Sequence, residues 1–202
     1  MKKLLPVKYF LLPSLKGRAR GEGLIFYFSL FISSLLFFSC SKAEPLYDTW
    51  PARFVVQNAN NIPVLNSALG GMGEFCTAVR QGTTVTYTNL KTSHQVNLTA
   101  SEVNYGNFNF GRVGGFIVGH TSMISSRFPN QVVCYDMVCS NCYEGLSVSR
   151  ALNLLSGARA QCAKCQRIYD LNELGMVISE GGGRSLFRYS VSYNSYQLII
   201  GR

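Results

Sequence analysis

The sequence predicts an all-β protein, a small β-sandwich or barrel that follows an export segment. Three observations lead to this prediction. Only 14% of the 202 residues are charged, about half the usual share, which fits a half-buried β-protein. Short apolar and β-branched runs recur along the chain, separated by clusters of Gly, Asn, Ser and Pro. Residues 186–193 alternate with a period of two, which puts their aromatic side chains on one face of a strand.

Residues 1–39 are predicted to be a signal peptide of the lipoprotein type. A basic stretch ends at Arg20 and an apolar run follows at 24–38. As a helix this run would rise about 22 Å, too short to span a bilayer comfortably but suited to the hydrophobic region of a signal peptide. The next residues, Ser39 and Cys40, resemble the lipobox of bacterial lipoproteins, although Phe37 stands where that motif usually has Leu. The resemblance implies that Cys40 carries the lipid anchor; the alternative is a short membrane anchor with an incidental cysteine.

This export segment sets the expected location and the charge of the mature chain. Residues 40–50 form a linker that bears the lipid anchor, and the domain is expected to face the periplasm or the cell exterior at the cell envelope. The segment 1–39 holds six basic residues and one acidic residue, so its removal lowers the formal net charge from +9 to +4. The remaining positive charges are scattered, which argues against nucleic-acid binding.

The mature domain, residues 51–202, is predicted to be built from short strands. Segment 149–160 is the exception, expected as a short helix or an ordered loop because Gly157 would end a helix there. The expected strands, in chain order, are 53–57, 74–80, 84–90, 95–99, 115–120, 131–138, 167–171, 176–179, 186–193 and 196–200.

Two Cys-x-x-Cys pairs are the strongest chemical signal. Cys139 and Cys142 form the first pair, Cys162 and Cys165 the second, and 19 residues separate them. This spacing is typical of a four-thiolate metal site, because a tight turn aims both sulfurs of a pair at one point and two facing turns complete a tetrahedron. Such a site suits zinc, a single iron or an iron–sulfur cluster. Disulfides are the alternative, since an exported chain matures in an oxidising compartment.

The other cysteines and the two histidines are expected to lie apart from this site. Cys76 and Cys134 fall in apolar strand segments and are interpreted as buried core thiols, with a mutual disulfide left open. His94 has polar neighbours and is expected in solvent. His120 follows a Gly-rich strand and is interpreted as a surface or loop histidine rather than a ligand.

The region 132–200 resembles a Rieske-type domain. A strand, a first Cys loop at 139–145, a second Cys loop at 162–170, a Gly-containing turn and closing strands follow one another in the order of that family. The second loop is similar to the family's Cys-x-x-His-x-x-x-Phe-Asp box, with Tyr169 and Asp170 at its end. The resemblance implies a Rieske-like β-sandwich, a [2Fe–2S] cluster, electron transfer and a redox partner protein.

The loops depart from the Rieske pattern at the ligands. Asn141 occupies the first histidine position, Cys142 follows it, and Cys165 occupies the second histidine position. Both loops therefore look more like rubredoxin or zinc-ribbon loops, and a cluster would be held by four cysteines.

The sequence therefore predicts a membrane-anchored electron carrier with a [2Fe–2S] cluster on Cys139, Cys142, Cys162 and Cys165. The alternative is a lipoprotein binding module with a structural zinc or iron site, or with disulfide-linked loops, and no redox role. No catalytic constellation is present in the sequence, so a carrier or binding protein is expected rather than an enzyme. The Gly-rich stretches at 69–73 and 180–185 are expected to form turns with positive φ.

Overall fold

The computed structural model describes residues 46–99, 109–123 and 131–201, and everything below refers to these. Their secondary structure is mostly antiparallel β, as predicted, with short helices in addition. The predicted signal peptide and Cys40 lie outside the described residues. Among those described, no helix is long and apolar enough to cross a membrane.

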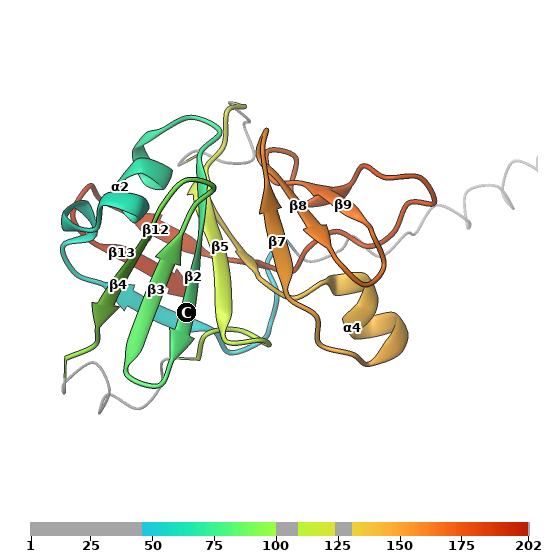
Figure 1. The fold of residues 1–202 in the computed structure, drawn as a ribbon, viewed down its shortest axis with the longest axis horizontal. Helices are drawn as coiled ribbons and strands as arrows, with labels where there is room; N and C mark the ends of the chain where they lie inside the picture. The colour runs from blue at the N-terminus through green and yellow to red at the C-terminus, as the bar shows by residue number, and fades with distance from the viewer. Residues whose placement is uncertain (1–45, 100–108, 124–130, 202) are drawn as a thin grey trace, which may run out of the picture. The chain divides into compact units, whose positions relative to one another are not determined.

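A six-stranded antiparallel sheet forms the centre of the domain (Figure 1), with its strands in the order β11-β6-β5-β2-β3-β4. The strands span β2 Phe75–Gln81, β3 Thr84–Thr88, β4 Ser93–Asn97, β5 Gly115–His120, β6 Val132–Asp136 and β11 Arg188–Tyr189.

The central sheet is covered on both faces at its middle strands β5 and β6, which explains why these strands are buried almost without interruption. Along β6, Val132 and Cys134 face one hydrophobic core, whereas Val133 and Tyr135 face a second one. The first core lies against helix α2, Pro63–Gly70, and a three-stranded sheet of order β1-β13-β12. The bounds of these strands are β1 Arg53–Val56, β12 Val191–Tyr193 and β13 Leu198–Gly201, and a 3₁₀ turn, η1, spans Ala59–Asn61.

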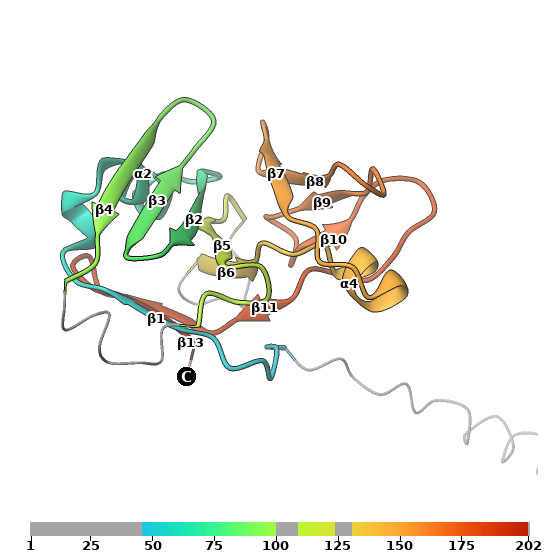
Figure 2. The same ribbon diagram turned by 60° about the horizontal axis from the view of Figure 1, so that its bottom comes forward.

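The second core lies against a four-stranded sheet, which is formed by the chain segment between β6 and β11. The chain leaves the central sheet at the end of β6 and returns at β11, which pairs with β6 through Arg188↔Tyr135 and Tyr189↔Cys134. The chain segment that connects these two strands forms the inserted sheet, whose strand order is β10-β9-β8-β7. Figure 2 shows it beside the central sheet. Its elements are helix α4 Ser140–Leu146 and strands β7 Leu152–Leu155, β8 Arg159–Cys162, β9 Ile168–Asp170 and β10 Met176–Val177.

Two predicted elements differ from the structure. Segment 149–160 is not helical but forms the β7–β8 hairpin, whose turn places Gly157 and Ala158 at φ of 72° and 54°. The predicted strand 186–193 is broken at Ser190: β11 pairs with β6, whereas β12 pairs with β13 in another sheet. Its strict alternation also fails, because Leu186 and Arg188 are buried alongside Tyr189.

A buried arginine ties the N-terminal segment of the described chain to the domain. The Arg112 guanidinium forms ion pairs with Asp48 at 2.8 Å and with Asp136 at 3.5 Å. It also lies 3.9 Å from the ring centroid of Phe187 and 4.8 Å from that of Trp50. Opposite charges and aromatic faces together compensate the burial of the cation.

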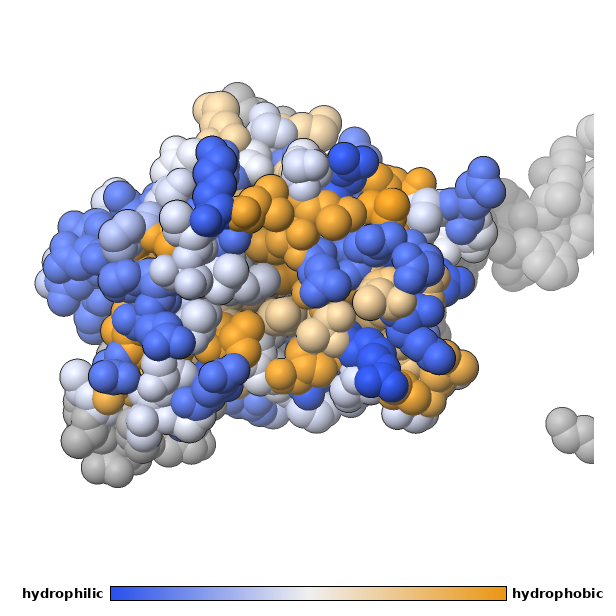
Figure 3. Space-filling model, viewed as in Figure 1, coloured by the Kyte–Doolittle hydropathy of each residue, from blue (hydrophilic) through white to orange (hydrophobic). Residues whose placement is uncertain are grey.

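A small pocket lies at the surface beside the inserted sheet. It has a volume of about 110 Å³ and lies between the start of β2 and the β7–β8 turn, with Phe75, Leu90 and Leu154 among its lining residues. Hydrophobic residues lie at the surface over the β7–β8 region on the face drawn in Figure 3, with hydrophilic residues next to them.

Candidate metal centre

The first cysteine pair lies at the point where the chain leaves the central sheet. The N–H of Cys139 donates to the carbonyl of Arg150 at 2.8 Å, so the loop is closed at its base by strand-like pairing. Helix α4 begins at the next residue and brings Cys142 into its first turn. The helix ends at Leu146 and is capped by Ser147, whose φ of 52° lets the N–H of Val148 bond the Cys142 carbonyl at 3.2 Å.

The second pair lies at the tip of the β8–β9 hairpin. Cys162 is the last residue of β8, and its N–H bonds the Arg167 carbonyl at 3.1 Å. The N–H of Gln166 bonds back to the Cys162 carbonyl at 2.9 Å, and Gln166 takes a left-handed φ of 58°. This tight turn aims Cys165 in the same direction as Cys162.

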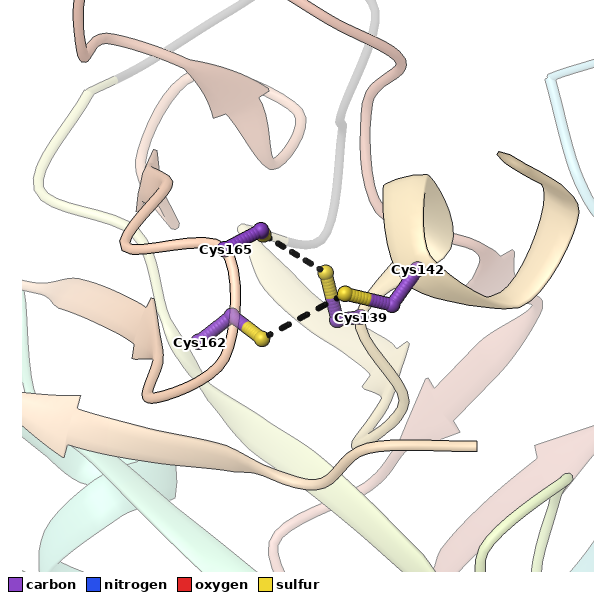
Figure 4. Close-up of side chains that lie close together, drawn as sticks. All are labelled: Cys139, Cys142, Cys162 and Cys165. Carbon is purple, nitrogen blue, oxygen red and sulfur yellow. Dashed lines mark hydrogen bonds between the residues drawn. The ribbon is translucent and has the colours of Figure 1, made fainter. Parts of the chain in front are cut away.

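The four sulfur atoms converge between the two loops (Figure 4). All four lie within 4.8 Å of one another. Two contacts join the loops: Cys139 Sγ to Cys165 Sγ at 3.6 Å and Cys142 Sγ to Cys162 Sγ at 3.8 Å. The structure therefore brings together all four residues that the sequence singled out as metal ligands.

The two sulfur contacts between the loops have the spacing of a tetrahedral coordination shell. With metal–sulfur bonds of about 2.3 Å, two thiolates on one tetrahedral ion lie about 3.8 Å apart. The two contacts across the loops match this distance. They are also far longer than a disulfide bond of about 2.05 Å, and all six described cysteines are free thiols. The four-cysteine donor set could hold a thiophilic metal ion.

Burial and hydrogen bonding act differently on the thiols. Burial raises the pKa values of Cys139 and Cys142, which disfavours thiolates in the absence of a cation. Burial also acts to raise the pKa of the partly exposed Cys165. The backbone N–H and the side chain of Arg167 outweigh this effect, so the pKa of Cys165 is lowered to about 7. Four thiolates in so small a volume repel one another, so the charged form of the site requires a bound cation.

A second layer of side chains holds the sulfurs in place. The Tyr169 hydroxyl lies 3.1 Å from Cys139 Sγ, and Asn141 Nδ2 donates to the same hydroxyl at 2.9 Å. The orientation of the Asn141 amide is fixed by the backbone of Arg184, whose N–H donates to Oδ1 and whose carbonyl accepts from Nδ2, each at 3.0 Å. Because Nδ2 donates to Tyr169, the phenolic proton is directed at the Cys139 sulfur.

The remaining candidate residues lie away from the sulfur cluster. Cys76 and Cys134 are fully buried in the first core, as interpreted, and both face the same neighbour, Val118, from opposite sides of β5. With a whole strand between them they are too far apart for a disulfide, because adjacent strands are already about 4.8 Å apart. His94 is exposed on β4, and the His120 ring contacts the carbonyl of Thr121 at 2.9 Å.

Neither models of protein families nor curated proteins match the chain. The chemical assignment of the site therefore depends on its residues and geometry.

Several residues at the site were not identified as functional from the sequence. Asn141 was noted only as standing in a histidine position, and Arg184 only as part of a Gly-rich turn. Their contact joins positions 43 residues apart, and no local pattern predicts it. Tyr169, expected at the end of the second Cys loop, lies in strand β9, and its hydroxyl contact with Cys139 depends on the three-dimensional arrangement.

Proposed function

We propose that the protein binds one metal ion through Cys139, Cys142, Cys162 and Cys165, and that this ion fastens the two cysteine loops of the inserted sheet. The observation that carries the proposal is the convergence of four sulfurs within 4.8 Å, from loops on different elements. In a tetrahedral shell with bonds of about 2.3 Å every sulfur–sulfur distance is about 3.8 Å, so sulfurs that lie up to 4.8 Å apart need to close by only about 1 Å around an ion.

A structural role for the ion is supported by the composition of the site. In the described part of the chain, the metal-binding group contains four cysteines and no His, Asp or Glu. Four thiolates fill a tetrahedral shell and leave no position for water or substrate, which is the pattern of structural sites. Three of the cysteines also belong to the second hydrophobic core, so the ion would stabilise the packing around it.

Zinc is the ion that this environment favours. Zn²⁺ has no redox chemistry and prefers tetrahedral thiolate coordination, so it would remain bound in an oxidising compartment. When bound, it neutralises part of the thiolate charge and fixes the loops. Cys139 and Cys142 would hold it from the start of α4, and Cys162 and Cys165 from the β8–β9 hairpin.

The biological setting remains the one predicted from the sequence. We propose that the domain is exported and attached to the membrane through a lipid on Cys40, at the cell envelope. There it would act as a metal-stabilised binding module.

The second candidate function is electron transfer through a [2Fe–2S] cluster on the same four cysteines, with a redox partner protein. It is favoured by the order of the elements along the chain. Both Cys loops follow strand β6 and precede strand β11, and the Rieske resemblance likewise implies a strand, two Cys loops and closing strands in this order. The Tyr169 hydroxyl beside Cys139 would also tune a cluster. Against it, thiolates on different irons point away from each other, which requires a wider sulfur group than the one observed.

Analysis of the purified mature protein for zinc, iron and acid-labile sulfide tests the proposal. We expect one zinc per chain, no labile sulfide and no visible colour. Chelator should lower the melting temperature and reductant alone should not. Two irons with two sulfides would establish the second candidate instead, and a metal-free protein that melts on reduction would establish disulfides.

A further inference from the structure

The Gly-rich segment Gly181, Gly182, Gly183 and Arg184, here called the strap, contacts both cysteine loops at once. We infer that the strap locks the two loops together and thereby sets the rate at which the bound metal leaves. This inference rests on the proposed metal site and adds a retention device to it. Two of the residues that the strap contacts, Ser140 and Asn141, are each next to a proposed ligand in the sequence.

The strap binds the first loop through a paired amide contact. The backbone N–H and carbonyl of Arg184 bond Oδ1 and Nδ2 of Asn141, each at 3.0 Å. Ser140 Oγ donates to the same carbonyl at 3.0 Å. Since Ser140 and Asn141 lie between Cys139 and Cys142, these bonds fix the position of the first Cys-x-x-Cys turn.

The strap binds the second loop through one arginine. Arg167 Nε donates to the carbonyl of Gly182 at 3.0 Å. The backbone carbonyl of Arg167 also accepts the N–H of Cys162 at 3.1 Å. Arg167 therefore connects the strap to a proposed ligand of the second loop, as Asn141 and Tyr169 connect it to Cys139 of the first loop.

Only glycine fits at the centre of the strap. Gly183 has a φ of 149°, a conformation that other residues rarely adopt. A Cβ on Gly183 would lie 2.5 Å from Asn141 Oδ1 and 3.0 Å from Arg167 Nε. These are the two side chains through which the strap holds the loops, so any larger residue would push both contacts apart.

The consequence concerns metal release. Four thiolates enclose the ion, so it can leave only after one loop swings away from the other, which is a local opening of the structure. Because the strap is bonded to both loops, at least one of its contacts has to break before that opening. Residues of this kind outside the ligand set typically change metal affinity by about 10- to 100-fold.

The test measures transfer of Zn²⁺ from the full mature protein to an excess of a chromophoric chelator. We expect Asn141→Ala and Gly183→Ala to accelerate transfer by about 10- to 100-fold. Two control variants change residues in or next to the strap. Gly181→Ala also falls at a positive φ, 85°, but its Cβ meets nothing within 4 Å. Glu144→Gln removes the exposed ion pair between helix α4 and Arg184 and leaves the backbone contacts in place. Both controls should release zinc at nearly the wild-type rate.

Substitution of zinc by cobalt distinguishes the loss of the strap's contacts from the loss of a metal ligand. The Co²⁺–thiolate charge-transfer spectrum of each variant should match wild type, because all four ligands remain. If Asn141→Ala has the wild-type cobalt spectrum and the two proteins release zinc at the same rate, the inference is wrong although the metal site stands. If wild type binds no metal, the proposed function fails and the inference with it. Asn141→Ala decides the matter even if Gly183→Ala does not fold.

Discussion

The six described thiols differ in what surrounds them, and that difference determines their chemistry. Cys76 and Cys134 lie among apolar side chains, and burial raises the pKa of the Cys76 thiol to about 12. The four clustered cysteines are also mostly buried, but each has other sulfurs within reach and two of them have hydrogen-bond donors. Burial alone makes a thiol inert, whereas convergence allows several thiols to share one cation.

Replacing a clustered thiol and replacing a core thiol should therefore have different effects. Cys162→Ser removes one of four ligands and is expected to abolish stoichiometric zinc binding and to lower the melting temperature. Cys134→Ala is the matched control, because it removes an equally buried thiol on another strand. It should cost about 1 kcal/mol and leave one zinc per chain. Metal analysis and thermal melting of both variants check this; equal zinc loss in the two would contradict the assignment.

Asp136 is a second residue whose environment makes a measurable prediction. Burial raises its pKa, and the hydrogen bonds from Tyr189, at 2.7 Å, and from the Arg112 and Val138 N–H groups offset this only in part. The folded state thus binds a proton more readily than the unfolded chain, where the pKa is about 3.9. Its contribution to stability is largest at low pH and is lost as the pH rises through the folded pKa.

The comparison of wild type with Asp136→Asn isolates this contribution. The variant should be less stable throughout, because its amide cannot accept all three hydrogen bonds. The difference in free energy of unfolding should be largest near pH 4 and should shrink toward pH 7, since only wild type loses the benefit of protonation. Denaturant unfolding of both proteins across this range measures it. A difference that grows with pH would mean that the ion pair with Arg112 lowers the pKa instead.

Among the secondary-structure elements, the strands of the central sheet could be predicted well. Segments such as 84–90 and 115–120 are apolar or β-branched and are bounded by turn residues, so their pattern is local. Helix α2 was not predicted, because its apolar positions, Val64, Leu65, Ala68 and Leu69, occupy less than three turns. The β7–β8 hairpin was predicted wrongly, because Leu-rich residues with a following Gly fit a helix end as well as a three-residue turn.

Two glycines in these elements should respond in opposite ways to alanine. Gly157 in the β7–β8 turn has a φ of 72°, so Gly157→Ala should lower the free energy of unfolding by about 1 kcal/mol. Gly70 is the last residue of helix α2 and a Cβ there meets nothing within 4 Å, so Gly70→Ala should raise it by about 0.5 kcal/mol. Denaturant unfolding of the zinc-loaded proteins checks both signs; stabilisation by Gly157→Ala would contradict the hairpin turn.

At the scale of the whole molecule, the site depends on contacts between distant parts of the chain. The two Cys-x-x-Cys pairs are local motifs, and their spacing was sufficient to predict that they meet. The strap could not be predicted, since its contact with Asn141 depends on the path that the segment between β10 and β11 takes past helix α4. The Arg112 cluster was missed for the same reason, because it gathers Asp48, Asp136 and Phe187 from three segments.

The predicted membrane attachment also belongs to this scale. Cys40→Ala should abolish metabolic labelling of the protein with a radioactive or clickable fatty acid and leave unprocessed precursor. Zinc binding by the domain should be unaffected, because Cys40 is not part of the four-cysteine group. Persistent labelling of the variant would contradict a lipid on Cys40.

The central claim is that one ion is held by all four cysteines, and X-ray absorption at the metal edge of the purified protein tests it most directly. We predict a single shell of four sulfurs at about 2.3 Å and no second metal nearby. A short metal–metal distance, or nitrogen and oxygen atoms in the first shell, would contradict the claim.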